Sequence, residues 1–274
     1  QIRKKSADYP APQAVQDRDV CEILKKLNRF DLISLCVGGG YIGMFSGKKI
    51  VTPGTVGRTT DRLYKKGLVN VNLSDGPAGL RILRRSAIRH GMVRMADYTM
   101  HFMKYLPDRF KRLILADPEK DKLEYQFCTA FPVATSLAQT WNTELCERIG
   151  RAVSVEMEVY NVTYWLAPAM NIHRNPLCGR NFEYYSEDPL LTGRIAAAVV
   201  RGVQSIPGNY AAIKHFACNN QEDNRNYSNS VVSERALREI YLKGFRICVR
   251  EAAPKAVMSS YNLLNGVYRS EEHT

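Results

Sequence analysis

Several apolar, β-prone stretches of this chain end in strings of charged and hydrogen-bonding residues. The first stretch, 69–73, continues into Ser-Asp-Gly-Pro-Ala-Gly-Leu-Arg at 74–81. An aspartate at the end of a strand, here Asp75, can accept hydrogen bonds from two neighbouring hydroxyl groups of a sugar, and the Gly-Pro turn behind it would fix its direction. The same string is a common turn former, so the residues alone also allow a purely structural turn.

A second polar string, at 173–183, reads His-Arg-Asn-Pro-Leu-Cys-Gly-Arg-Asn-Phe-Glu. The planar guanidinium of Arg180 suits either the hydroxyl groups of a ligand or a carboxylate of the protein. Glu183 is its expected partner. An Arg–Glu pair that only braces the loop is the alternative.

Two more stretches end in comparable groups. Lys214 and His215 close the stretch 211–216, and Arg225 follows nine residues after it. Converging cations of this kind suit a polyhydroxylated ligand and would lower the pKa of a nearby carboxylate. Tyr261 ends the last β-prone stretch, where its hydroxyl could bind a carboxylate and its ring could pack against a sugar. The structural alternatives are a packing histidine and a half-buried strand tyrosine.

Other kinds of catalytic site have little support in the sequence. The seven cysteines form no Cys-x-x-Cys pair, and the chain has no Gly-x-Ser-x-Gly string. The scattered cysteines favour a reducing, cytoplasmic setting. We therefore expect no metal and no cofactor, because metal-ligand spacing is also missing among the five histidines, His90, His101, His173, His215 and His273.

The net charge of +12 raises the possibility of a nucleic-acid partner. The surplus is spread out, however, with eleven Lys and Arg against six Asp and Glu over 81–126. Such a distribution is more typical of a solvated surface. No apolar run approaches the ~20 residues of a membrane-spanning helix. We expect neither a nucleic-acid nor a membrane partner.

The β-prone stretches alternate with helical patterns. Stretches at 69–73, 131–141, 162–167, 211–216 and 257–261 are separated by segments with helix-starting residues, namely Asn142 or Thr143, Asp188-Pro189 and Ser233. This α/β alternation predicts a parallel sheet, and polar strings after the strands favour a (β/α)8 TIM-type barrel, of which only early strands are present. A doubly wound sheet would share the alternation, but it usually carries a glycine-rich phosphate loop that this sequence lacks.

Taken together, the polar strings resemble the N-terminal domain of glycoside hydrolase family 3, in its β-glucosidase-like branch. The string Lys-His-Phe-Ala-Cys at 214–218 differs from the Lys-His-Phe-Pro-Gly pattern of the hexosaminidase branch. The matching strings occur in the family's order, at 74–81, 131–142, 166–189, 213–225, 233–245 and 257–266.

The resemblance implies a retaining β-glycosidase that removes terminal β-D-glucosyl residues. By position, Asp75 would bind hydroxyl groups of the sugar in subsite −1, and Arg180, Lys214 and His215 would be further sugar-binding donors. The residues that would line the pocket are Arg81, Arg225 and Tyr261. β-Xylosidase or arabinosidase specificity and a non-catalytic carbohydrate-binding or scaffold protein are the alternatives.

The resemblance also implies what the chain lacks. The family's nucleophilic aspartate lies in a Thr/Ser-Asp-Trp string, which does not occur here, and its acid/base glutamate belongs to a second α/β domain. We expect this chain to be inactive alone and to need that domain as its partner.

The final Arg-Ser-Glu-Glu-His-Thr matches the translation of a sequencing adapter. The expected organisation is a linker or arm at 1–18, a helix and loop at 19–60, a partial barrel at 61–268 with a basic, partly helical insertion at 82–127 over one face, and a non-native tail at 269–274.

Overall fold

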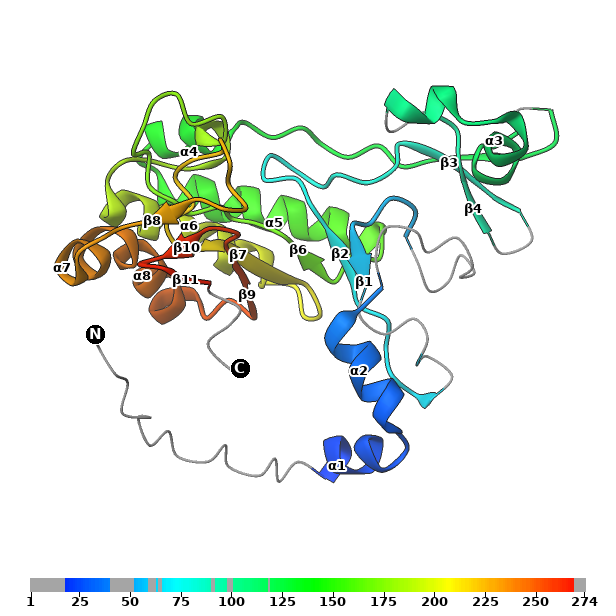
Figure 1. Ribbon diagram of the computed structural model, residues 1–274, viewed down its shortest axis with the longest axis horizontal. Coiled ribbons are helices and arrows are strands. Elements are labelled where there is room, and N and C mark those ends of the chain that lie inside the picture. Colours follow the sequence, from blue (N-terminus) through cyan, green and yellow to red (C-terminus); the bar gives the residue numbers. More distant parts are fainter. Residues whose placement is uncertain are drawn as a thin grey trace.

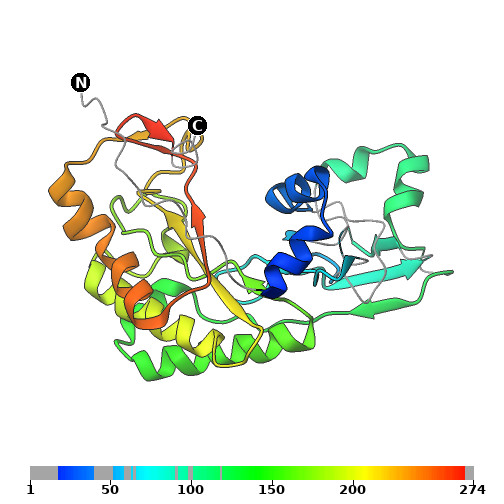
Figure 2. The same cartoon turned by 90° about the horizontal axis from the view of Figure 1, so that it is seen from below.

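The computed structural model describes residues 18–39, 52–58, 63, 66–89, 92–97, 101–117 and 119–268. Its main body is an α/β unit with an open, curled five-stranded sheet (Figures 1 and 2). The strand order is β1-β2-β6-β7-β9, in which β1 runs antiparallel to β2 and the other pairs are parallel. The strands are β1 (Gly57–Arg58), β2 (Asn72–Ser74), β6 (Tyr164–Trp165), β7 (Tyr210–Phe216) and β9 (Ala256–Ser259).

The predicted parallel sheet is thus confirmed. The four predicted strands that form it keep their order, and their observed bounds differ from the predicted ones by a few residues. In a parallel sheet the carboxyl ends of all strands lie at the same edge, which brings the polar strings after β2, β6, β7 and β9 together.

Three long helices pack side by side outside this sheet (Figures 1 and 2). They are α5 (Thr143–Val159), α6 (Pro189–Val203) and α8 (Lys243–Ala252). The predicted starts of α5 and α6 are confirmed, because Asn142 accepts from the Leu145 N–H and Asp188 accepts from the Leu190 N–H. A short helix, α7 (Glu234–Ala236), is capped by Ser233 and continues through a π-helical turn, η4 (Leu237–Tyr241), towards α8.

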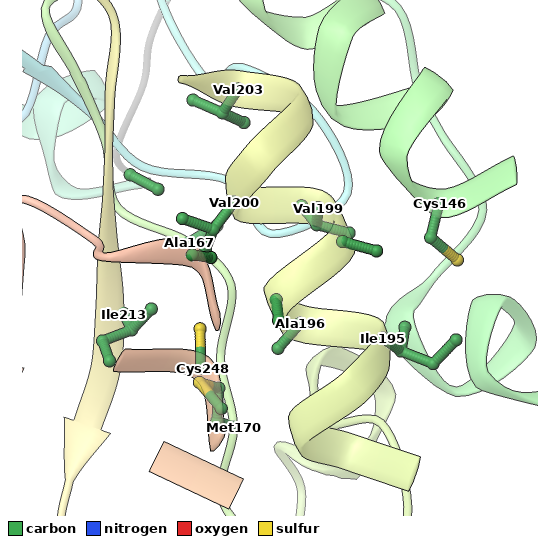
Figure 3. Close-up of a cluster of buried hydrophobic side chains, with 14 of the residues drawn as sticks. Cys146, Ala167, Met170, Ile195, Ala196, Val199, Val200, Val203, Ile213 and Cys248 are labelled. Carbon is green, nitrogen blue, oxygen red and sulfur yellow. The ribbon is translucent and has the colours of Figure 1, made fainter. Parts of the chain in front are cut away.

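The core lies around α6, the most deeply buried helix. Figure 3 shows its apolar side chains between the sheet and the neighbouring helices. Close helix contact depends on two glycines, since a Cβ on Gly202 would overlap the carbonyl oxygen of Glu147 in α5, and one on Gly193 would lie 2.8 Å from Ile247 in α8. The fully buried α6 residues include Ile195, Ala196, Ala197, Ala198, Val199, Val200 and Val203.

One predicted strand was wrong. The stretch 131–141 contains a helix, α4 (Ala134–Gln139), and contributes no strand to the sheet. Its buried residues Ala134, Leu137 and Ala138 are three and four positions apart, which puts them on one face of a helix. That helical spacing outweighed the β-prone residues at the start of the stretch.

The basic insertion is only partly helical, as predicted, but it also contains a three-stranded antiparallel sheet that was not predicted. The sheet has the order β4-β3-β5. In both views the insertion projects away from α6 and α8 and does not lie over them (Figures 1 and 2). Its elements are β3 (Arg85–Arg89), β4 (Met92–Met95), η2 (His101–Tyr105), α3 (Asp108–Ile114) and β5 (Leu123–Tyr125).

The N-terminal part forms two short helices, α1 (Arg18–Lys25) and α2 (Arg29–Val37). Asn28 and Asp31 make a reciprocal capping box at the start of α2.

At the other end of the chain, β10 (Leu263–Leu264) pairs with β8 (Asn229–Ser230) and β11 (Val267–Tyr268) in a small sheet. Residues 1–17 of the expected arm at 1–18, together with the expected tail at 269–274, lie outside the described residues, and Arg18 begins α1. No helix of the described parts is long and apolar enough to cross a bilayer.

Candidate functional site

The carboxyl ends of three parallel strands bring four charged residues together. Asp75 follows β2, and Lys214 lies in the second half of β7. Arg180 and Glu183 come from the loop after β6, where Glu183 ends a short 3-10 helix, η3 (Asn181–Glu183). The chain segments that supply these side chains are far apart in sequence, and the parallel sheet places them at one edge.

Asp75 and Lys214 form the centre of this group. The Lys214 Nζ donates a hydrogen bond to Asp75 Oδ1 at 2.9 Å, and Lys214 is only 2% exposed. Burial alone would raise the pKa of Asp75, but the charge and hydrogen bond of Lys214, helped by the Gly76 backbone and the charge of Arg81, hold it below the ordinary value. Asp75 is therefore an ionised carboxylate that faces a fixed cation.

Glu183 connects the two cations of the group. Its Oε1 accepts a hydrogen bond from Arg180 Nε, and its Oε2 lies 3.7 Å from Lys214 Nζ. Burial alone would lower the pKa of Arg180, but the hydrogen bond to Glu183 and nearby negative charge raise it. The expected pairing of Arg180 with Glu183 is confirmed. Charges thus alternate along the series Arg180, Glu183, Lys214, Asp75.

His215 is a neutral part of the same site. Its Nε2 lies 2.7 Å from Arg180 Nη2, and its Nδ1 lies 3.4 Å from the Tyr184 hydroxyl. A guanidinium can only donate, so Nε2 accepts and Nδ1 carries the proton. Burial, with the positive charges of Arg180, Lys214 and Arg225, lowers the pKa of His215 to about 2.

Buried amides hold His215 in place. Asn171 makes two hydrogen bonds to its backbone, donating to the His215 carbonyl at 3.0 Å and accepting from its N–H at 2.9 Å. The Tyr184 hydroxyl donates to the carbonyl of Asn219 at 3.1 Å and accepts from its side-chain amide at 3.0 Å. Sequence reasoning missed Tyr184 and Asn171, which no local pattern distinguishes from packing residues.

A second arginine lies beside the group. Arg225 Nη1 donates to Glu222 Oε2 at 2.8 Å, and its guanidinium lies 5.2 Å from the centre of the Tyr261 ring. Glu222 Oε1 is also 3.8 Å from Arg180 Nη1, so this carboxylate links the two arginines. Tyr261 is 57% exposed, which leaves a ring face available for contact.

Arg81 is close to the site but differs from the other expected residues. Its backbone N–H bonds to the carbonyl of Asp75 at 2.8 Å, which closes the turn after β2. Its side chain is exposed and acts on Asp75 through its charge. All seven expected residues therefore lie at this edge of the sheet, with Asp75, Arg180, Lys214 and His215 in direct polar contact and Arg225 with Tyr261 beside them.

The arrangement suits a neutral ligand with several hydroxyl groups. An ammonium has three N–H donors and a guanidinium has five, so Lys214 and Arg180 keep donors beyond those bound by Asp75, Glu183 and His215. A cavity of about 680 Å³ is lined in part by Asn219 and Glu222, which contact the site, but its lining includes none of the seven expected residues. Within the described parts of the chain, no group of three or more His, Cys, Asp or Glu side chains could hold a metal ion.

The chain is similar to known glycosidases in sequence and in fold. Over 145 residues the chain is 57% identical to beta-glucosidase A of Butyrivibrio fibrisolvens. This match covers 53% of this chain and 17% of that protein. It is 38% identical over 208 residues to an exo-alpha-(1->6)-L-arabinopyranosidase of Bifidobacterium longum, covering 76% and 24% of the two chains. The structure of beta-glucosidase 3B from Thermotoga neapolitana in complex with alpha-D-glucose superposes with a TM-score of 0.73 at 45% identity, covering 91% of this chain and 30% of that one.

The chain spans less than a third of the length of each of these proteins. Residues 113–273 match the family model described as "Glycosyl hydrolase family 3 N terminal domain". That match covers more than half of the chain. The chain therefore belongs to glycosyl hydrolase family 3.

Proposed function

We propose that this chain forms the sugar-binding part of a β-glucosidase that removes terminal non-reducing β-D-glucosyl residues with retention of configuration. The observation that carries the proposal is the Asp75–Lys214 pair beside Arg180, at the carboxyl ends of β2 and β7. Relatives named as β-glucosidases, and a similar structure that contains glucose, support the choice of sugar.

Asp75, Lys214 and Arg180 would make the main hydrogen bonds to the sugar in subsite −1. The ionised carboxylate of Asp75 would accept from two neighbouring hydroxyl groups, and the two cations would donate to hydroxyl oxygens. His215 has both ring nitrogens in contact with protein groups, so it would reach the sugar only after Arg180 exchanges its bond to Nε2 for one to the ligand. Arg81, Arg225 and Tyr261 would line the pocket and position the substrate.

The complete enzyme would extend this curled sheet into a (β/α)8 TIM-type barrel and add a second α/β domain. Its catalytic carboxylates would lie outside these 274 residues, because the family's Thr/Ser-Asp-Trp string is not among them. One carboxylate would form the glycosyl-enzyme and the other would act first as acid and then as base. In that organisation the arm at 1–18, the helix and loop at 19–60 and the partial barrel at 61–268 would precede the nucleophile. We also propose a cytoplasmic location, because the seven cysteines are scattered along the sequence and form no Cys-x-x-Cys pair.

A pentose-releasing activity is the second candidate. The relative named exo-alpha-(1->6)-L-arabinopyranosidase is the observation that favours it. A pentopyranoside lacks the hydroxymethyl group of glucose, so the same donors and acceptors could serve both sugars. The β-xylosidase alternative rests on the same reasoning.

Turnover by the full-length protein tests both candidates. Aryl β-D-glucopyranoside should be hydrolysed with a higher kcat/KM than aryl β-D-xylopyranoside or α-L-arabinopyranoside, and the sugar should be released with retained configuration. A higher kcat/KM for a pentoside would replace the first candidate by the second. Binding of glucose without turnover of any glycoside would indicate a carbohydrate-binding scaffold.

Residues 1–274 alone provide the matched control. We expect this chain to hydrolyse none of the three glycosides, because it would lack both catalytic carboxylates. Hydrolysis by the chain alone would contradict the proposed position of the nucleophile.

A further inference from the structure

Glu183 is the most deeply buried carboxylate among the charged residues of the site. It is 3% exposed, and it lies between two cations that would face the sugar. A buried ion is costly unless nearby charges and hydrogen bonds compensate it, so its position between Arg180 and Lys214 needs both partners. Conversely, each cation has the Glu183 carboxylate as a neighbour within the protein.

The two oxygens of Glu183 serve different cations. Oε1 accepts from Arg180 Nε, the N–H at the base of the guanidinium, so the outer nitrogens stay available for His215 and for a ligand. Oε2 lies 3.7 Å from Lys214 Nζ, which also donates a hydrogen bond to Asp75. One carboxylate thereby sets the direction of the guanidinium and the place of the ammonium.

We propose that Glu183 is a positioning residue that fixes Arg180 and Lys214 for sugar binding without touching the sugar itself. The inference deepens the proposed function and rests on it. The buried ammonium of Lys214 and the half-buried guanidinium of Arg180 repel each other, and Glu183 offsets that repulsion. Without it, Arg180 loses its anchor at Nε, and Lys214 keeps Asp75 as its only acidic contact among the described residues.

An isosteric substitution separates charge from shape. In Glu183→Gln one oxygen becomes an NH2 group, which is a donor and would face one of the two cations. In Glu183→Asp the charge stays, but the carboxylate withdraws by one methylene and cannot span both cations equally well. The exposed Glu187, four residues further along, provides the matched control as Glu187→Gln.

The experiment measures kcat and KM of the full-length enzyme on an aryl β-D-glucopyranoside, and the rise in Tm that D-glucose produces. We expect E183Q to lose about tenfold to a hundredfold in kcat/KM, mostly through KM, the range for losing a hydrogen bond to a charged group. The same variant should lose most of the glucose-induced rise in Tm. E183D should recover part of both, and E187Q should match the wild type.

Several outcomes would overturn the inference. Unchanged KM and glucose response in E183Q would show that Glu183 does not position the cations. A loss confined to kcat, or a lower Tm with normal KM, would show another role. If E183Q does not fold, E183D tests the inference instead. A wild-type KM in E183D would mean that only the charge at this position is needed, and the positioning role would be overturned.

Failure of the proposed function gives a different pattern. A wild-type enzyme that neither hydrolyses glycosides nor responds to glucose would refute sugar binding at this site. The crystal structure of E183D then tests the positioning alone. Displaced Arg180 and Lys214 side chains would uphold it, and unmoved side chains would overturn it.

Discussion

The ammonium of Lys214 lies 2.9 Å from the carboxylate of Asp75, although 139 positions separate the two residues in the chain. Lys214 belongs to β7, whereas Asp75 follows β2, and β6 lies between these strands in the sheet. The pair thus joins the ends of two non-adjacent strands. It also places an ammonium group, only 2% exposed, beside a carboxylate, which makes the pair part of both the fold and the site.

Lys214→Met should destabilise the protein, because Asp75 would lose the cation that compensates its burial. We expect a loss of about 1–3 kcal/mol in the free energy of unfolding, less than for a fully buried pair because the Asp75 side chain is 33% exposed. Urea-induced unfolding measures the change. Lys243→Met, at an exposed position of α8, is the control and should change stability little. Equal losses of unfolding free energy in the two variants would mean that the Asp75–Lys214 pair does not specifically stabilise the protein.

Asp75→Asn should change the acid limb of the stability curve. The pKa of Asp75 in the folded protein is below the ordinary value of 3.8. The ionised Asp75 carboxylate therefore stabilises the folded protein above about pH 3.8. This stabilisation is lost as the pH falls through the folded pKa. The stability difference between wild type and D75N should shrink as the solution is acidified below pH 3.8. A difference that stays constant or grows there would contradict the ionised, lysine-bound state of Asp75.

His215 should not titrate in the folded protein at physiological pH. Its folded pKa is about 2, whereas the ordinary value is 6.5, so between these values the unfolded chain binds one more proton at this residue. The contribution of His215 to stability is complete above pH 6.5 and falls steadily as the pH decreases. In His215→Gln, stability should depend less steeply on pH over this interval. An imidazole resonance of His215 that titrates near pH 6.5 would disprove the neutral assignment.

Gly202→Ala should disturb the contact between α5 and α6. A Cβ at this position would overlap the carbonyl oxygen of Glu147 and lie 2.8 Å from the backbone nitrogen of Arg151. Neither backbone atom can move without shifting α5, so we expect a loss of about 1–3 kcal/mol, typical of overpacking. Thermal or urea unfolding measures it. Gly179→Ala has no atom within 4 Å of its added Cβ and should be nearly neutral.

Local sequence signals predicted most of the secondary structure. Asn142, Asp188 and Ser233 each cap a helix at the expected place, because an N-cap depends on a side chain and N–H groups two or three residues away. The strand predicted at 131–141 was wrong because the β-prone beginning of this stretch conflicts with its helical burial pattern. That burial pattern is visible only once the core is known. The three strands of the insertion also had no distinct local signal.

The strings of polar residues, taken in order along the sequence, determined the family and the candidate residues Asp75, Arg180, Lys214 and His215. Only the tertiary structure decided how these residues act on one another. It placed Glu183 between two cations, made His215 an acceptor for Arg180, and kept the Asp75 carboxylate ionised. Each of these properties depends on burial and on charges from segments far apart in the chain, which become neighbours only when parallel strands align their carboxyl ends at one edge of the sheet.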